Sequence, residues 1–122
     1  LARISGADFI HAGMWGGYLS DTKEDLINWL SILTSKNDLG FKKTVPSFSC
    51  GSHPGLVQTT VKNFGIDIMM SLGGSMHGHP SGTVSGAKAM RQAFDLLFQK
   101  SQNKSDLKEY NEAIEKWGFI DD

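Results

Sequence analysis

The sequence predicts an α/β protein built on a parallel sheet. Three short apolar stretches, at residues 8–12, 44–49 and 66–72, are each followed by a glycine-rich loop and then by a segment with helical spacing of apolar residues. Strands that alternate with helices form parallel sheets through βαβ units. The chain has 122 residues, of which 39% are hydrophobic and 20% charged, so it can form one domain at most.

The first unit joins the strand at 8–12 to a helix that begins near Asp21. Glu24 follows Asp21 by three residues, the spacing of a capping box at a helix N-terminus. We expect the helix to end within residues 37–40. Its predicted buried face comprises Leu26, Leu30 and Leu33.

The second unit joins the strand at 44–49 to a helix that ends near Phe64 and is closed by Gly65. The third strand, at 66–72, is predicted to be buried on both faces, because its apolar residues do not alternate with polar ones. The next helix is expected to bury Val84, Ala87, Met90, Phe94 and Leu97. A polar linker at 100–105 leads to a final helix around 106–117, with Leu107, Tyr110, Ile114 and Trp117 on one face.

Three parallel strands leave two edges unpaired and one face uncovered. The chain is therefore expected to be part of a larger α/β barrel, or to complete its sheet by self-association. It opens at Leu1, and residues 1–6 resemble the last turn of a helix, so we interpret it as a piece of a longer protein. In a barrel, the loops that follow the strands form the active face.

The composition argues against several classes of protein. Lys and Arg number 12 against 13 Asp and Glu, so no basic surface is available for nucleic acid. The apolar runs are too short to predict a membrane span. A single cysteine, Cys50, excludes a disulfide framework and a cysteine-rich zinc site, and is typical of a reducing, cytoplasmic compartment.

Glycines after two neighbouring strands indicate a binding site for phosphate. Gly73 and Gly74 follow the third strand, and Gly51 follows the second. Glycine lets backbone N–H groups approach an anion without interference from a side chain. The alternative is that these glycines only permit tight turns between strand and helix.

The histidines could take part in several kinds of chemistry. His11 ends the first strand, where it could donate to a substrate or transfer a proton, or could be a half-buried, hydrogen-bonded residue. A metal site at His77 and His79 is disfavoured, because no carboxylate lies near them in the sequence. Ser49 could bind a substrate hydroxyl group. Cys50 could be a nucleophile activated by His53, although a buried small hydrophobic residue is the favoured interpretation.

Three segments, at 5–13, 46–55 and 72–82, resemble the sixth, seventh and eighth strand regions of the RuBisCO large-subunit barrel. Their order and spacing agree over nearly the whole chain. The resemblance implies that residues 1–122 are a single partial domain, the C-terminal portion of a TIM (β/α)8 barrel. It implies that the parent protein is an enzyme and a homo-oligomer that binds a phosphorylated small molecule.

The resemblance also implies roles for individual residues. His11 would contact the phosphate or reacting end of the substrate, and Ser49 would bind a substrate hydroxyl group. The backbone amides of three glycines would bind a phosphate: Gly51, Gly73 and Gly74. The magnesium ligands of the family lie on the second barrel strand, which has no counterpart in this sequence. We therefore expect no metal site in these 122 residues and no turnover by them alone.

One departure from the family pattern bears on the reaction. Where RuBisCO carries a lysine that stabilises its carboxylated intermediate, this sequence has Tyr18. The resemblance is closer to RuBisCO-like proteins, among them the methionine-salvage enolase, so we expect a magnesium-dependent enolase or isomerase acting on a phosphorylated ketose-like compound. A genuine ribulose-bisphosphate carboxylase and a non-catalytic phosphate-binding or assembly domain are the alternatives. The aromatic loop at 14–18, with Trp15 and Tyr18, could cover a ligand or pack against a neighbouring loop.

Overall fold

The computed structural model describes residues 1–98 and 107–121, and the polar linker predicted at 100–105 lies outside these ranges. Three parallel strands form one sheet in the order β1–β2–β3, as the sequence predicts. The strands are β1 (Phe9–Met14), β2 (Val45–Ser49) and β3 (Met69–Met70). The helices are α1 (Lys23–Thr34), the 3₁₀ turn η1 (Pro54–Leu56), α2 (Val57–Phe64), α3 (Gly73–His77), α4 (Thr83–Leu97) and α5 (Lys108–Trp117).

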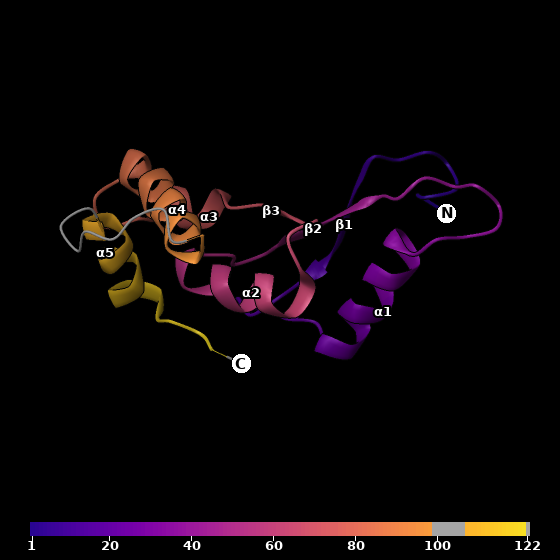
Figure 1. Cartoon of the computed structure of the whole chain (residues 1–122). Coiled ribbons are helices and arrows are strands. Elements are labelled where there is room, and N and C mark those ends of the chain that lie inside the picture. The colour runs from indigo at the N-terminus through magenta and orange to yellow at the C-terminus, as the bar shows by residue number, and fades with distance from the viewer. Residues whose placement is uncertain (99–106, 122) are drawn as a thin grey trace.

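The helices are distributed unevenly around this sheet (Figure 1). Helix α1 lies at one end of the molecule, α4 and α5 lie at the other, and the strands and α2 lie between them. Because the three strands are parallel, the loops that follow them emerge at the same end of the sheet, where the strands have their C-terminal ends. The pairing of β1 with β2 shifts by one residue between His11 and Gly13, and it places Met14 beside Ser49.

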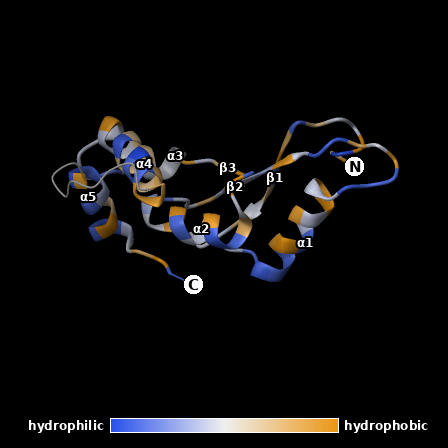
Figure 2. Ribbon diagram, viewed as in Figure 1, coloured by the Kyte–Doolittle hydropathy of each residue, from blue (hydrophilic) through white to orange (hydrophobic). Residues whose placement is uncertain are grey.

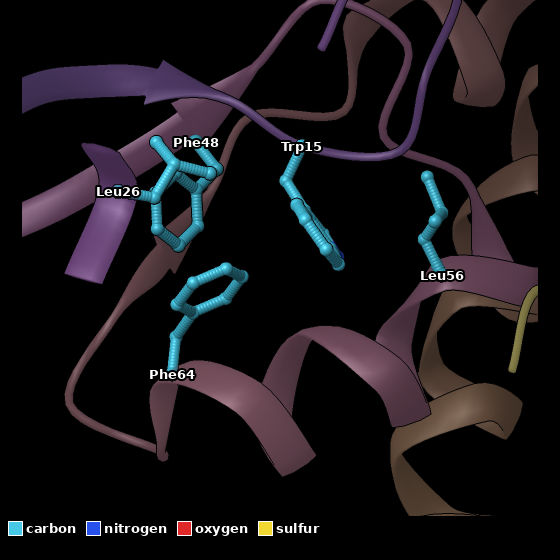
Figure 3. Packing of buried hydrophobic residues seen from close by; sticks show 5 residues of the cluster. All are labelled: Trp15, Leu26, Phe48, Leu56 and Phe64. Atoms are coloured by element: carbon cyan, nitrogen blue, oxygen red, sulfur yellow. The ribbon is translucent and has the colours of Figure 1, made fainter. Parts of the chain in front are cut away.

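The core around α2 is aromatic. It joins one residue after β1, one from α1, one from β2 and two from η1 and α2: Trp15, Leu26, Phe48, Leu56 and Phe64. In Figure 3 the ring of Phe64 points toward those of Phe48 and Trp15, and its centroid lies 5.0 Å from each of them. Trp15 is only 8% exposed, so it packs in the core and does not cover a ligand. A second cluster, made of Val57, Met90 and Ala93, holds α2 against α4.

The N-terminus of α1 differs from the predicted capping box. The cap is Thr22, whose hydroxyl oxygen accepts a hydrogen bond from Asp25 N at 3.2 Å. Asp21 instead closes the loop before the helix, because its carboxylate accepts from Met14 N at 2.8 Å. The helix also ends at Thr34, earlier than residues 37–40. Ser35 leaves the helical conformation with a ψ of 154°, and the Arg3 guanidinium donates to the carbonyl groups of Ile32, Ser35, Phe41 and Lys42.

Two predicted buried faces are wrong in detail. Strand β3 has two residues, and Met69 is 41% exposed, so this strand is not buried on both faces. Helix α4 buries Met90 as predicted, and Phe94 and Leu97 are partly buried against the same cluster. Val84 and Ala87 are exposed instead, and the other buried residues of the helix are Gly86, Ala89 and Ala93. Gly86 faces inward because it lies against the backbone of Met76, where no side chain would fit.

Apolar residues also lie on the surface. Figure 2 shows hydrophobic segments on the outer helices as well as on the strands. On α1, Ile27, Trp29 and Ile32 are exposed, and on β1 so is Phe9. Within the described residues, no helix combines the length and the apolar character that a membrane span requires.

Candidate functional site

A cleft of about 680 Å³ lies at the C-terminal ends of the three strands. Each of the three loops contributes to it, and so do the end of α5 and the segment that follows. The lining residues are Gly16, Gly17, Tyr18, Ser49, Cys50, Gly51, Ser52, His53, Ser71, Gly73, Gly74, Ser75, Trp117 and Ile120. The structure therefore brings together four of the predicted site residues, namely Ser49, Gly51, Gly73 and Gly74.

His11 does not line the cleft but connects to it through Ser49. The imidazole Nε2 of His11 forms a hydrogen bond with Ser49 Oγ across the β1–β2 pair. Ser49 Oγ lies 3.3 Å from Cys50 Sγ and donates to it. Which of His11 and Ser49 donates depends on the tautomer of the imidazole. His11 is exposed, so the half-buried interpretation is wrong.

Gly51 is required by the contact between two loops. Its φ is +110°, and a Cβ there would lie 2.9 Å from Gly17 Cα and 3.0 Å from Tyr18 N. A Cβ on Gly17 would in turn lie 2.4 Å from the carbonyl oxygen of Cys50. The two glycines let the loops after β1 and β2 touch backbone to backbone, which forms one wall of the cleft.

Gly73 and Gly74 differ from Gly51 in this respect. They occupy the first turn of α3, where backbone N–H groups have no partner within the helix. Neither residue has a positive φ, and a Cβ at either position would meet no atom within 4 Å. Neither close packing nor a positive φ therefore requires glycine at positions 73 and 74. This weakens the interpretation that the two glycines only permit a tight turn.

Two of the four histidines are buried. His53 is 5% exposed; its Nδ1 accepts from Gly55 N at 3.2 Å, and its ring stacks on Trp117 with centroids 6.0 Å apart. Burial lowers the pKa of His53 below its ordinary value of 6.5. His79 is equally buried, and its ring donates from Nε2 to Glu109 O at 2.9 Å and accepts at Nδ1 from Ser81 N at 3.1 Å. Within the described residues, no three His, Cys, Asp or Glu side chains are placed to hold a metal ion.

Cys50 departs from the favoured interpretation as a buried small hydrophobic residue. It is only half-buried and lines the cleft. Its φ is +60°, a backbone conformation that residues other than glycine rarely adopt. The His53 Nδ1 that would activate a thiol is already engaged with Gly55 N. The contact that the structure gives Cys50 Sγ is with Ser49.

Several cleft residues were not identified as site residues from the sequence. Ser71 follows β3 directly, and its hydroxyl group lies 3.1 Å from that of Ser47 on β2. The position of Ser71 at the end of a predicted strand could have identified it as a site residue. Trp117 was assigned only to a helix face, and no local pattern marks Ile120. Both reach the cleft because the segment after α5 returns to η1, where Ile120 N donates to Gly55 O at 3.2 Å.

The parallel sheet and the cleft built from the loops after its strands define an α/β protein with its main cleft at the C-terminal ends of the strands. Residues 1–117 match the family model for the ribulose bisphosphate carboxylase large chain, catalytic domain. The chain belongs to this family.

The similar proteins include two kinds of enzyme. A 2,3-diketo-5-methylthiopentyl-1-phosphate enolase from Geobacillus thermodenitrificans is 34% identical over 98% of the chain, and a ribulose bisphosphate carboxylase from Pyrococcus furiosus is 35% identical over 98%. The chain spans 29% of the length of each. Sequence identity therefore does not separate the two activities.

Solved structures agree with the fold. The octameric Rubisco from Pyrococcus horikoshii matches with a TM-score of 0.82 and 31% identity, covering 94% of this chain and 28% of that one. A rubisco-like protein from Alicyclobacillus acidocaldarius matches with a TM-score of 0.82 and 29% identity, covering 96% of this chain and 30% of that one. The predicted α/β fold with a parallel sheet is thus confirmed.

Proposed function

We propose that the chain forms the phosphate-binding part of the active site of a larger RuBisCO-like enzyme. In this proposal, residues 1–122 are a single partial domain, strands six to eight and the last helix of a TIM (β/α)8 barrel. The similarity to solved structures of which the chain covers less than a third supports this placement. The parent would be a cytoplasmic homo-oligomer, in line with relatives described as octameric and dimeric.

The observation that carries the proposal is the open space beside Gly73 and Gly74. A Cβ at either position would project into that space, so the two glycines leave room for an anion beside their backbone amides. Both glycines line one cleft with Gly51 and several serine hydroxyl groups. Backbone amides and hydroxyl groups bind phosphate through hydrogen bonds.

His11 and Ser49 would act on the rest of the substrate. The hydrogen bond between them holds the Ser49 hydroxyl at the cleft, where its oxygen can also meet a substrate hydroxyl group. Imidazole groups commonly act as general acids or bases, and His11 lies next to the cleft through its hydrogen bond to Ser49. We assign His11 to the reacting end of the substrate and Ser49 to its binding.

We infer that the parent is an enolase or isomerase that acts on a phosphorylated ketose-like compound, of the methionine-salvage type. Tyr18 supports this inference: it lines the cleft where the family resemblance places a lysine in RuBisCO, and it offers no cation to a developing carboxylate. Magnesium is expected for the parent. The described residues do not form a ligand set for it.

A genuine carboxylase is the second candidate, since carboxylases from Pyrococcus furiosus and Thermococcus kodakarensis are 35% and 36% identical to the chain. Carboxylation of ribulose bisphosphate by the full-length protein would establish it. A non-catalytic phosphate-binding or assembly domain is the third. It would be favoured by a concentration-dependent mass in solution together with a lack of turnover by the full-length protein.

The phosphate site is tested with two alanine variants. Gly73→Ala and Gly74→Ala place a methyl group where the anion would lie, and we expect each to weaken binding of inorganic phosphate by about tenfold or more, the loss of one charge-assisted hydrogen bond. Each should leave the free energy of unfolding unchanged or raise it by about 0.5–1 kcal/mol, because alanine stabilises a helix relative to glycine.

The measurement is a phosphate titration followed by backbone amide NMR shifts, paired with urea unfolding. Gly82→Ala is not a matched control, because Gly82 has a positive φ. Ser81→Ala is suitable, because Ser81 is exposed and its hydroxyl group contacts Glu112 outside the cleft. Unchanged phosphate affinity in both glycine variants would contradict the site.

A further inference from the structure

Helix α5 holds together the two loops that carry the cleft glycines. On the side of the loop after β2, Trp117 stacks on His53, and Ile120 N donates to Gly55 O at 3.2 Å. On the side of the loop after β3, the Lys116 ammonium group donates to Gly78 O. The end of α5 therefore bridges the segment that follows Gly51 and the segment that follows Gly74.

The contact at Gly55 is close. A Cβ on Gly55 would lie 2.1 Å from the carbonyl oxygen of Gly118, so the end of α5 is seated directly on the backbone of η1. The same Gly55 donates its N–H to His53 Nδ1. Gly55 thus accepts a hydrogen bond from the segment after α5 through its carbonyl group and donates one to the His53 imidazole through its amide.

The His53 hydrogen bond requires a neutral imidazole. Nδ1 can accept from Gly55 N only while it carries no proton, because a protonated imidazole has donors at both nitrogens. Protonation would set two N–H groups against each other in a buried position, next to the Trp117 ring. Burial, which lowers the pKa of His53, acts in the same direction.

The surroundings of His53 offer no compensating anion. The charged or titratable groups on neighbouring elements are engaged elsewhere: Lys116 with Gly78 O, Asp121 with Lys62 at 3.4 Å, and His77 with Thr83 at 3.2 Å. Cys50 shares the cleft lining. Within the described residues, His53 forms no ion pair. The other buried histidine, His79, also accepts a backbone hydrogen bond at Nδ1, from Ser81 N at 3.1 Å, and Glu112 lies 4.0 Å from that atom.

We propose that His53 is a positioning residue whose neutral imidazole docks α5 against both loops of the anion site, and whose protonation releases this support. The coupling to the anion site rests on the proposed function, whereas the docking of α5 does not. Acidification then weakens anion binding without any change in the residues that touch the anion.

The test follows three signals in the 122-residue chain between about pH 7.5 and 5.5, the range in which histidine titrates. The first is the ring of His53 and the second is the indole Nε1–H of Trp117, both by NMR. The third is the affinity for inorganic sulfate, a probe whose charge stays constant over this range. We expect the first two to share one midpoint and sulfate affinity to fall by about fivefold, at the low end of couplings between sites.

His53→Asn supplies the decisive comparison, because the asparagine side-chain oxygen can accept from Gly55 N but does not titrate. In this variant the Trp117 signal and sulfate affinity should be independent of pH. His77→Gln, which removes an exposed histidine, should leave the wild-type midpoints unchanged. If His53→Asn does not fold, the shared midpoint in the wild-type chain decides.

The outcomes are distinguishable. A Trp117 signal that does not change when His53 is protonated would overturn the docking role. A Trp117 signal that titrates while sulfate affinity stays constant would overturn the coupling to the anion site. Titration of Trp117 with no sulfate binding at any pH would also overturn the coupling, and it would count against the phosphate site itself while the docking role stands.

Discussion

Cys50 is the residue at which the cleft departs most from ordinary backbone geometry. It lies at the end of β2 with a φ of +60°, and the next residue, Gly51, continues the turn with a φ of +110°. A left-handed conformation costs a residue with a Cβ about 1 kcal/mol relative to glycine. The hydrogen bond from Ser49 to Cys50 Sγ is a weak one and offsets little of this cost.

Replacing Cys50 by glycine should therefore stabilise the chain. We expect Cys50→Gly to raise the free energy of unfolding by about 0.5–1 kcal/mol, because the strain is relieved while the unfolded chain gains some freedom. Urea unfolding measures the change. Cys50→Ala is the control, since it removes the thiol but keeps a Cβ, and it should give no gain. Destabilisation by glycine alone would show that the turn is not strained.

Helix ends were predicted with mixed success, and the cause lies in long-range contacts. Gly65 closes α2 as expected, because its role depends only on the preceding turn. The end of α1 was placed too late: Ser35 leaves the helical conformation, and the carbonyl groups of Ile32 and Ser35 accept from the Arg3 guanidinium, some thirty residues away in sequence. No local pattern carries that information.

The cleft was predicted from topology more than from any single motif. Parallel strands place the loops that follow them at the same end of the sheet. This is why Ser49, Gly51, Gly73 and Gly74 line one cleft. The contributions of Trp117 and Ile120 could not be predicted, because they depend on how α5 packs back on Gly55. On α4 the prediction fails only at Val84 and Ala87, for a related reason: the first turns of the helix place Gly86 against the backbone of Met76.

The docking of α5 should weaken in acid. Burial lowers the pKa of His53 in the folded chain below 6.5, so the unfolded chain binds more protons as pH falls below that value. The stability contributed by neutral His53 is complete above pH 6.5 and is lost as pH falls toward the lower, folded pKa. Urea unfolding at about pH 7.5 and 5.5 should show this loss, and His53→Asn should reduce it. An equal loss in the variant would assign the effect to other groups.

At the scale of the whole molecule, the sheet is open at both edges as far as the described residues go. Within residues 1–98 and 107–121, strand β1 pairs on one side only, and so does β3. Exposed apolar residues lie beside these edges, with Phe9 on β1, Met69 on β3, and Trp29 and Ile32 on α1. Together with the 29% share of its relatives' length, this pattern supports the proposal that the chain is one portion of a closed barrel, in which further strands would cover both edges.

The assignment of His11 is tested in the full-length protein that carries this sequence. We expect His11→Ala to lower the turnover of a phosphorylated ketose-like substrate by about 10²–10⁴-fold, the usual contribution of a positioned acid–base group. Ser49→Ala should act mainly on KM, because we assign Ser49 to binding and it retains no proton-transfer role of its own. Steady-state kinetics on enolase substrates measure both.

His77→Gln serves as the control in that experiment, because His77 is exposed and hydrogen-bonds Thr83 outside the cleft. It should retain wild-type turnover. Unchanged turnover in His11→Ala would remove His11 from the reaction and leave it as the residue that orients the Ser49 hydroxyl group. Detectable carboxylation by the wild-type protein would instead show that Tyr18 does not exclude the carboxylase reaction, since the tyrosine is the residue on which that exclusion depends.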